Sequence, residues 1–357
     1  ISYSAQFVDC CSAAFLAKLK SPRNAATTQT QLELADARTD ITGLQDITRI
    51  WASFHFLPYD LYAHLEEGSL PYKSKFRLLC NVNGVLVAET VELAREKGPE
   101  AYGLAMHILA DTWAHRYFAG TPSLVLNNTN YCFSEIIKEN GVLREKPVRF
   151  RHNPSSGDDL EQGFYNNTVF RLSENAIMNL GHGRAGHLPD YSFMRYRYMP
   201  AWGNYAVIIK DNPSDYMHAF RQMVYALKYL RGEYDTFELC RYDREAVDPL
   251  SDEIMSLLEK RQADASADWK AFAEKLSGQT VEPFDTEKYV PEYIEARGKE
   301  KDATVLGKFI LAAVRQKSMV TNCIFHSGNL LAGYAVEKKR GWFGRALSQA
   351  EGRRETK

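Results

Sequence analysis

Residues 106–116, MHILADTWAHR, constrain the fold most, because three polar side chains stand at helical spacing in an apolar stretch. These side chains are His107, Asp111 and His115, each four residues from the next. On an α-helix, a step of four residues turns the side chain by about 40°, so all three lie within roughly 80° of arc. They share that arc with apolar residues, and polar groups in the interior need partners, either hydrogen-bonding groups or a metal ion. The segment therefore predicts an inward-facing helix with a polar stripe.

The spacing along this stripe limits how an ion could be shared. His107 and Asp111 lie about 6 Å apart along the helix axis and can bind one ion together. His115 is about 12 Å from His107 along the axis, so it would serve a neighbouring ion or orient another ligand. The pattern predicts either one ion with an orienting group or a cluster of two or three ions. Zinc is the expected ion for mixed histidine and aspartate ligands, manganese or iron is an alternative, and an ordinary His–Asp hydrogen bond is the other interpretation.

Further candidate ligands lie elsewhere in the chain. Asp9 is embedded in the apolar segment SAQFVDCC, and His55 lies between aromatic residues in FHFLPYD. His182 and His187 lie five residues apart in the glycine-rich segment GHGRAGHLPDY, which also contains Asp190. Together with the helical stripe, these residues predict a metal site built from several segments of the chain.

The remaining histidines and the cysteines are assigned ordinary roles. His64 is expected at the surface, His152 and His218 in solvent or in packing contacts, and His326 in the core. The six cysteines contain no C-x-x-C pair, and most of them lie in apolar runs. They therefore predict buried thiols in a reducing compartment, and not a zinc–cysteine site.

Apolar periodicity predicts a mainly α fold, a multi-helix bundle with long irregular loops. Helices are expected at residues 4–20, 73–97, 99–117, 174–180, 213–231, 250–276, 301–319 and 323–337. Loops are expected at 21–45 and 181–204, a short strand or loop at 47–54, and irregular chain with short β pieces at 118–170. The expected domains are a helical metal-site domain (1–240), a helical extension packed on it (241–337) and a flexible basic tail (338–357).

Charge and hydropathy narrow the class of protein. The formal net charge is −1, so no overall field attracts nucleic acid or an anionic membrane. No run approaches the ~20 apolar residues that span a bilayer. We expect a cytoplasmic protein, and the sequence does not specify its oligomeric state. The first residue is Ile1 and not methionine, so we also expect that the natural start of the chain is missing.

The order of the candidate ligands resembles a known pattern. An aspartate in an early helix, an aromatic-flanked histidine, a His-x-x-x-Asp pair with a further histidine, and a later histidine with an acid look like the zinc-dependent phospholipase C and fungal single-strand nuclease superfamily. Those proteins are helical, hold three zinc ions in one cleft and cleave phosphoester bonds. The segments YSAQFVD, GLAMHILADTWAHRYFAG and GHGRAGHLPDYSFMRYRYMPAW more closely resemble an uncharacterised bacterial family, a distant relative of those enzymes.

This resemblance implies a role for each candidate ligand. Asp9 resembles the carboxylate that bridges two ions, and His55 resembles the ligand that follows it. His107 and Asp111 are similar to the central His-x-x-x-Asp ligand pair. His115 resembles the next histidine ligand of the superfamily.

The later part of the pattern departs from the superfamily. His182 or His187 would stand where the last histidine does, with Asp190 in place of a glutamate. In the superfamily the free N-terminus and an early histidine complete a third ion site, and this chain begins after that point. Cys10 stands where the bacterial family tends to have a second acid. The resemblance therefore leaves three alternatives for this chain: one ion, two ions or the full set of three.

The function implied by the resemblance is metal-dependent hydrolysis of a small-molecule or lipid phosphoester. Asp9 or Asp111 would accept a proton from the attacking water besides binding metal. Arg184, Arg195 and Arg197 could hold the phosphate bidentately, although surface charges or clamps on nearby carboxylates are the other interpretation. The alternative function is a non-catalytic structural or interaction protein that keeps the fold with a partial or absent metal site.

Overall fold

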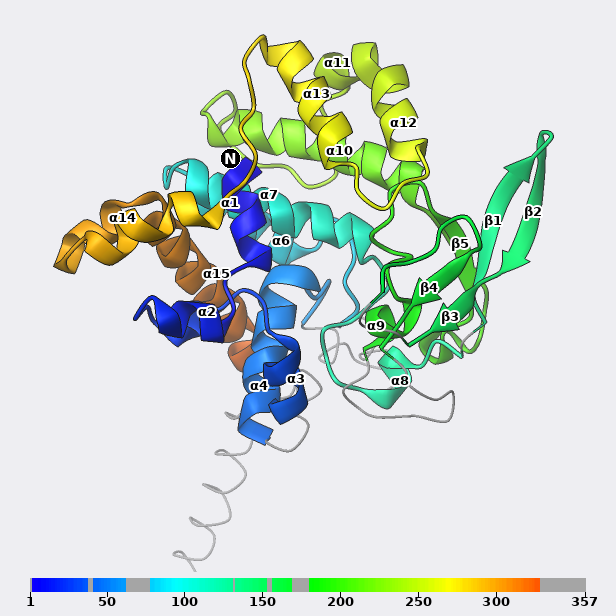
Figure 1. Cartoon of the computed structure of the whole chain (residues 1–357), viewed down its shortest axis with the longest axis horizontal. Helices are drawn as coiled ribbons and strands as arrows, with labels where there is room; N and C mark the ends of the chain where they lie inside the picture. The colour runs from blue at the N-terminus through cyan, green and yellow to red at the C-terminus, as the bar shows by residue number, and fades with distance from the viewer. Residues whose placement is uncertain are drawn as a thin grey trace, which may run out of the picture.

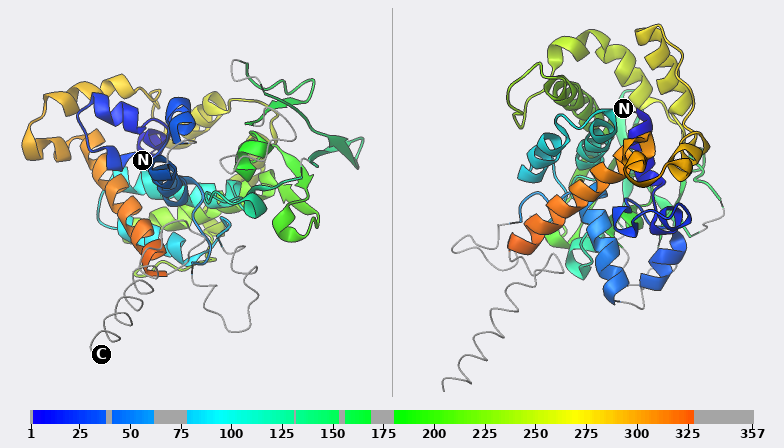
Figure 2. Two further views of the ribbon diagram at one scale, coloured as in Figure 1. Left: turned by 90° about the horizontal axis from the view of Figure 1, so that it is seen from below. Right: turned by 90° about the vertical axis from the view of Figure 1, so that its left-hand side faces the viewer.

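The computed structural model describes residues 2–37, 41–61, 78–130, 132–152, 156–168 and 180–327. Its helices are α1 Ser2–Gln6, α2 Ala13–Lys18, α3 Gln31–Ala37, α4 Ile41–Ile50, α6 Val85–Ala94, α7 Pro99–Ala114, α8 Leu124–Asn127, α9 Gly181–Ala185, α10 Asn212–Leu230, α11 Arg244–Val247, α12 Ser251–Glu259, α13 Ser266–Ser277, α14 Val290–Glu295 and α15 Val305–Ser327. Its strands are β1 Ser134–Glu139, β2 Val142–Pro147, β3 Arg149–Arg151, β4 Phe164–Asn166, β5 Arg195–Tyr198 and β6 Ile208–Asp211. The sheet and α14 lie at opposite ends of the molecule, and the β1–β2 hairpin projects from its edge (Figure 1 and Figure 2).

The fold is helix-rich but mixed α/β, so the prediction of a mainly α bundle is wrong. Four antiparallel strands form a sheet in the order β2-β1-β5-β6, and β3 pairs in parallel with β4. The glycines and prolines around β5 favour a loop, but its sequence RYRY alternates strictly. Tyr196 and Tyr198 are fully buried, while Arg195 and Arg197, which alternate with them, are half-buried. That alternation is the pattern of a strand with one covered face.

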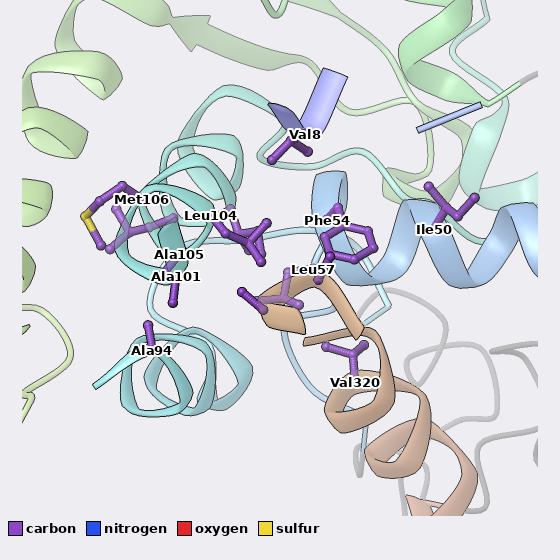
Figure 3. Close-up of a cluster of buried hydrophobic side chains, with 14 of the residues drawn as sticks. Val8, Ile50, Phe54, Leu57, Ala94, Ala101, Leu104, Ala105, Met106 and Val320 are labelled. Carbon is purple, nitrogen blue, oxygen red and sulfur yellow. The ribbon is translucent and has the colours of Figure 1, made fainter. Parts of the chain in front are cut away.

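Helix α7 lies at the centre of the main core and confirms the helix predicted at 99–117. Pro99 occupies its first turn, where the missing N–H of proline costs no hydrogen bond. Helices α1, α6, α10 and α15 pack against it. Figure 3 shows Leu104 of α7 facing the same apolar core as Phe54, Val8 and Val320 from three other segments. This packing holds the polar stripe of α7 in a fixed place.

Other elements differ from the expected ones. Residues 21–54, expected without helix, contain α3, α4 and a π-helix, η3 Trp51–His55. The helix expected at 4–20 divides into α1, a 3-10 turn (η1 Phe7–Asp9) and α2, and the one at 250–276 divides into α12 and α13. Helix α15 runs without a break through residues 319–323. Residues 174–179 of the helix expected at 174–180, the tail at 338–357 and His64 lie outside the described residues, and Leu180 directly precedes α9.

Three apolar cores hold the described elements together. The main core surrounds α7, and a second core, which includes Phe133 and Tyr196, lies against the sheet. A third core, which includes Ile254 and Phe272, joins α12 and α13 to α10. Within the segment expected as one C-terminal extension, α15 joins the main core and α12 and α13 join the third, and the division into domains stays a prediction. None of the described helices combines the length and apolarity that crossing a membrane requires.

Candidate metal centre

Asp9, His55 and His107 form a first group, whose potential ligand atoms all lie within 4.8 Å of one another. Three elements supply them, because Asp9 ends η1, His55 ends the π-helix η3 and His107 lies within α7. The N–H of Phe56 donates to the carbonyl of Trp51 at 2.7 Å and closes the wide turn of η3. Such π-turns recur at functional sites. Here the turn brings the ring of His55 edge to face with that of His107, with 5.5 Å between centroids.

His115, His182 and Asp190 form a second group within the same 4.8 Å limit. The Nε2 atoms of His115 and His182 lie 3.2 and 3.1 Å from the same Oδ1 of Asp190. Aromatic rings fix both imidazoles, since Phe56 stacks on His115 and Phe118 meets His182 edge to face. The structure thus selects His182, and not His187, as the partner of Asp190.

Asp111 lies between the two groups. Its Oδ2 is 3.2 Å from Nδ1 of His55, 3.3 Å from Nε2 of His107 and 3.6 Å from Nδ1 of His115. Burial raises the pKa of Asp111, but His107 and His115 outweigh burial and hold that pKa well below its usual range. Asp111 is therefore a carboxylate anion that contacts the histidines of both groups.

The hydrogen bonds of His55 leave a lone pair facing a carboxylate. Because a backbone carbonyl only accepts, Nε2 of His55 donates to the carbonyl of Thr27 at 2.9 Å. In the neutral ring Nδ1 is then a lone pair, and it lies 3.2 Å from Oδ2 of Asp111. Nearby, the buried Nε2 of His107 lies 3.3 Å from the same Oδ2 but does not form a hydrogen bond of good geometry. Lone pairs of ring nitrogens and of a carboxylate oxygen that lie this close together repel one another unless a cation, either a proton or a metal ion, lies between them.

His115 shows the same arrangement in the second group. Its Nδ1 donates to the carbonyl of His55 at 2.7 Å, so its Nε2 is the atom that faces Asp190. A backbone hydrogen bond that fixes the tautomer in this way is typical of histidines that bind metals. The donor set of imidazole nitrogens and carboxylate oxygens fits a divalent ion in each group.

The metal-free protein is expected to lose stability as the pH rises from 6 to 9.5. Burial lowers the pKa of His115, but Asp111 and Asp190 outweigh burial and raise it from 6.5 to about 9. The proton bound to His115 stabilises the fold fully at pH values below the pKa of this histidine in the unfolded chain. This stabilisation, at most about 3 kcal/mol, is lost as the pH rises through the pKa of His115 in the folded protein. Urea denaturation at the two pH values measures the loss. His115→Gln should remove the part that His115 contributes and leave that of His107, where the effect of burial is also outweighed by Asp111, which raises the pKa. A rise in stability over this range would contradict the assignment.

The two groups line one cavity of about 880 Å³, a size typical of small-molecule sites. His187 also lines this cavity but belongs to neither group. Its Nδ1 donates to Oδ2 of Asp158 at 2.9 Å, and 58% of its side chain is exposed. Asp158, which was not predicted as a site residue, also accepts hydrogen bonds from Tyr191 and from the backbone of Asn166. The tandem acids of SGDDLEQG are the only local signal for it.

The three arginines expected to bind phosphate are not among the described residues that line this cavity. Arg184 is 1% exposed. Arg195 donates to Asp211 at 3.0 Å, and Arg197 pairs with Glu145 at 2.5 Å. The last two arginines thus hold carboxylates around the sheet, and their part in substrate binding stays a prediction.

The histidines outside the site take part in packing or local hydrogen bonds. His218 stacks on Trp113 with 5.6 Å between ring centroids, and His326 meets Phe325 edge to face. His152 is exposed at the cavity wall, and its Nδ1 donates to a backbone carbonyl. All six cysteines are free, and they are buried, half-buried or exposed in equal number.

Gly186 shapes the loop that carries the second group, and Gly186→Ala should destabilise the fold by about 3 kcal/mol. Its φ of 60° and ψ of −142° are essentially restricted to glycine. A Cβ atom there would lie 2.1 Å from the carbonyl oxygen of Asn166. Thermal denaturation measures the effect. Gly157→Ala is the control, since nothing lies within 4 Å of its Cβ position, and equal small effects of both changes would contradict this account.

Comparison with known proteins places the chain in a family. Residues 1–324 match the model of a family of unknown function, DUF6765. No curated protein matches the sequence, and no solved structure matches it either. The expected kinship with an uncharacterised family is confirmed, whereas none of these comparisons links the chain to the phospholipase C and nuclease superfamily. Because the match covers most of the chain, the protein belongs to the DUF6765 family of unknown function.

Proposed function

We propose that this protein is a zinc-dependent hydrolase of phosphoesters. One observation carries the proposal: in each group, histidines held by backbone hydrogen bonds direct ring nitrogens at a carboxylate, with Asp111 between the groups. The resemblance of the ligand order to the zinc-dependent phospholipase C and fungal nuclease superfamily supports the same chemistry. The cavity of about 880 Å³ gives a small substrate access to both groups.

The donor sets favour zinc and leave room for chemistry. Zinc accepts imidazole nitrogen and carboxylate oxygen at about 2.0–2.2 Å, and catalytic sites hold it by three protein ligands with one open position. Each group supplies three such donors. When bound, zinc would lower the pKa of a water molecule and neutralise charge on the phosphoryl oxygens.

Asp9 and Asp111 would have different roles at the centre. Asp9 is exposed at the cavity, so it can accept a proton from the water that attacks phosphorus. Asp111 is a weak base, because the imidazoles around it hold its pKa low. Its role would be to orient His55, His107 and His115 toward the ions.

Metal analysis of two single variants tests the proposal. We expect about two equivalents of zinc in the parent protein and the loss of about one in His107→Ala and in His182→Ala, because each change removes one donor of one group. His218→Ala is the matched control, since His218 packs on Trp113 outside both groups. Hydrolysis of bis(p-nitrophenyl) phosphate should need the zinc and stop with a chelator. Bound zinc without turnover on any phosphoester would favour the non-catalytic alternative.

A further inference from the structure

We propose that a second cavity binds the aliphatic or aromatic group of a ligand whose polar end lies at the metal centre. This cavity, the C-terminal chamber, has a volume of about 540 Å³ and lies between α7, α10, α12 and α13. Its apolar wall includes Ala110, Ala114, Phe220, Met223, Leu258 and Trp269. The inference rests on the proposed function, because it names the class of substrate for the same centre.

The chamber adjoins the centre. Asp111, His115 and Asp190 line both the chamber and the 880 Å³ cavity that contains the two groups. They stand at the end of α7 and after α9, and the third core closes the chamber on the other side. A ligand held at Asp111 or Asp190 therefore has the chamber directly beside its polar end.

The chemistry of the wall favours an apolar group. Phe220 and Trp269 stack with 6.1 Å between centroids, and Met223 adds a flexible, polarizable surface. The described lining contains no lysine or arginine. An anion such as phosphate thus has no partner inside the chamber, and must lie at the centre if a metal ion is to balance its charge.

Four polar side chains of the wall donate hydrogen bonds within the protein. Tyr191, Ser192, Tyr216 and Gln262 each donate a hydrogen bond to a carboxylate or a backbone carbonyl. Because these donors are engaged within the protein, the wall offers mainly apolar contacts to an alkyl or aryl group. The substrate class that fits is a phosphoester with an apolar substituent next to the phosphate.

Calorimetric titration of the zinc-loaded full chain with n-alkyl phosphates, from butyl to octyl, tests this assignment. Burial of methylene groups increases affinity by up to about fourfold each, so we expect Kd to fall at least tenfold across the series. Ala263 is exposed and lines the chamber. Ala263→Phe should reduce the change in Kd across the series to less than about threefold. Ala267→Phe, at an exposed position outside the lining, should keep the full dependence.

Two results would overturn the assignment: Kd independent of chain length in the parent protein, or a full dependence that survives in Ala263→Phe. Alkanols of the same lengths separate this assignment from the proposed function, because they have no phosphate. If alkanol affinity depends on chain length and Ala263→Phe abolishes that dependence while no alkyl phosphate binds, the chamber is supported and phosphoester hydrolysis is contradicted. If alkyl phosphates bind but neither series shows the dependence, the chamber is contradicted alone.

Discussion

Asp111→Asn is expected to remove metal from both groups and to lower phosphodiester hydrolysis roughly a thousandfold, the loss of several kcal/mol of transition-state stabilisation. The side chain keeps its shape but loses its charge. Oδ2 of Asp111 faces nitrogen atoms of His55, His107 and His115 at 3.2–3.6 Å, so an amide there changes the charge next to both groups at once. No other described carboxylate contacts histidines of both groups.

Metal content by elemental analysis and turnover of bis(p-nitrophenyl) phosphate measure this effect, with circular dichroism to show that the variant is folded. Asp190→Asn is the matched comparison and should lose zinc from the second group alone, because among the described histidines its carboxylate pairs with His115 and His182 of that group. Asp158→Asn lies outside both groups and should keep both ions. Retention of two zinc equivalents and full turnover in Asp111→Asn would show that Asp111 does not support the centre.

The part of the site that the sequence could predict is the part that local geometry determines. The spacing of His107, Asp111 and His115 requires only a helix, and α7 forms because Pro99 and the apolar residues around the stripe favour one. The meeting of this stripe with Asp9 and His55 depends on tertiary packing. The resemblance to a known ligand order pointed to those two residues, and the structure brings them beside His107.

Non-local pairing explains what the sequence could not show. Strand β5 pairs with β1, which lies about 60 residues earlier, and no local pattern specifies that partner. The choice between His182 and His187 likewise depends on the conformation of Gly186, which lies between them and turns one ring toward Asp190 and the other toward Asp158. The π-helix at residues 51–55 adds one residue to a turn, and apolar periodicity alone does not distinguish it from a strand or loop.

A buried ion pair at the end of α7 should produce the second large effect. Lys210 of β6 is 1% exposed, and its Nζ donates to Oδ2 of Asp215 at 2.5 Å and to the carbonyl of Trp113 at 2.9 Å. Burial lowers the pKa of Lys210, and Asp215 opposes that effect. The buried ammonium group therefore depends on Asp215, and its contacts join α7, β6 and α10.

Asp215→Ala is expected to lower the free energy of unfolding by about 3–5 kcal/mol, because it leaves the ammonium group of Lys210 buried without its carboxylate. Lys210→Met should cost less, since Arg116 lies 3.8 Å from Asp215 and still balances its charge. The double variant should be more stable than the sum of the two losses predicts, with a coupling of at least about 1.5 kcal/mol. Urea denaturation of the four proteins gives this coupling, and a value near zero would mean that the two side chains act independently.

The same pair should also affect the metal centre unequally. Lys210 holds the carbonyl of Trp113 in the last turn of α7, two residues before His115, whereas His107 lies two turns earlier. Loosening that end of the helix therefore displaces the second group more than the first. In Asp215→Ala, zinc affinity of the second group should fall more than that of the first, and His182→Ala in the same background identifies which affinity belongs to which group. Equal losses at both groups would indicate general destabilisation of the fold instead of a local effect at the end of α7.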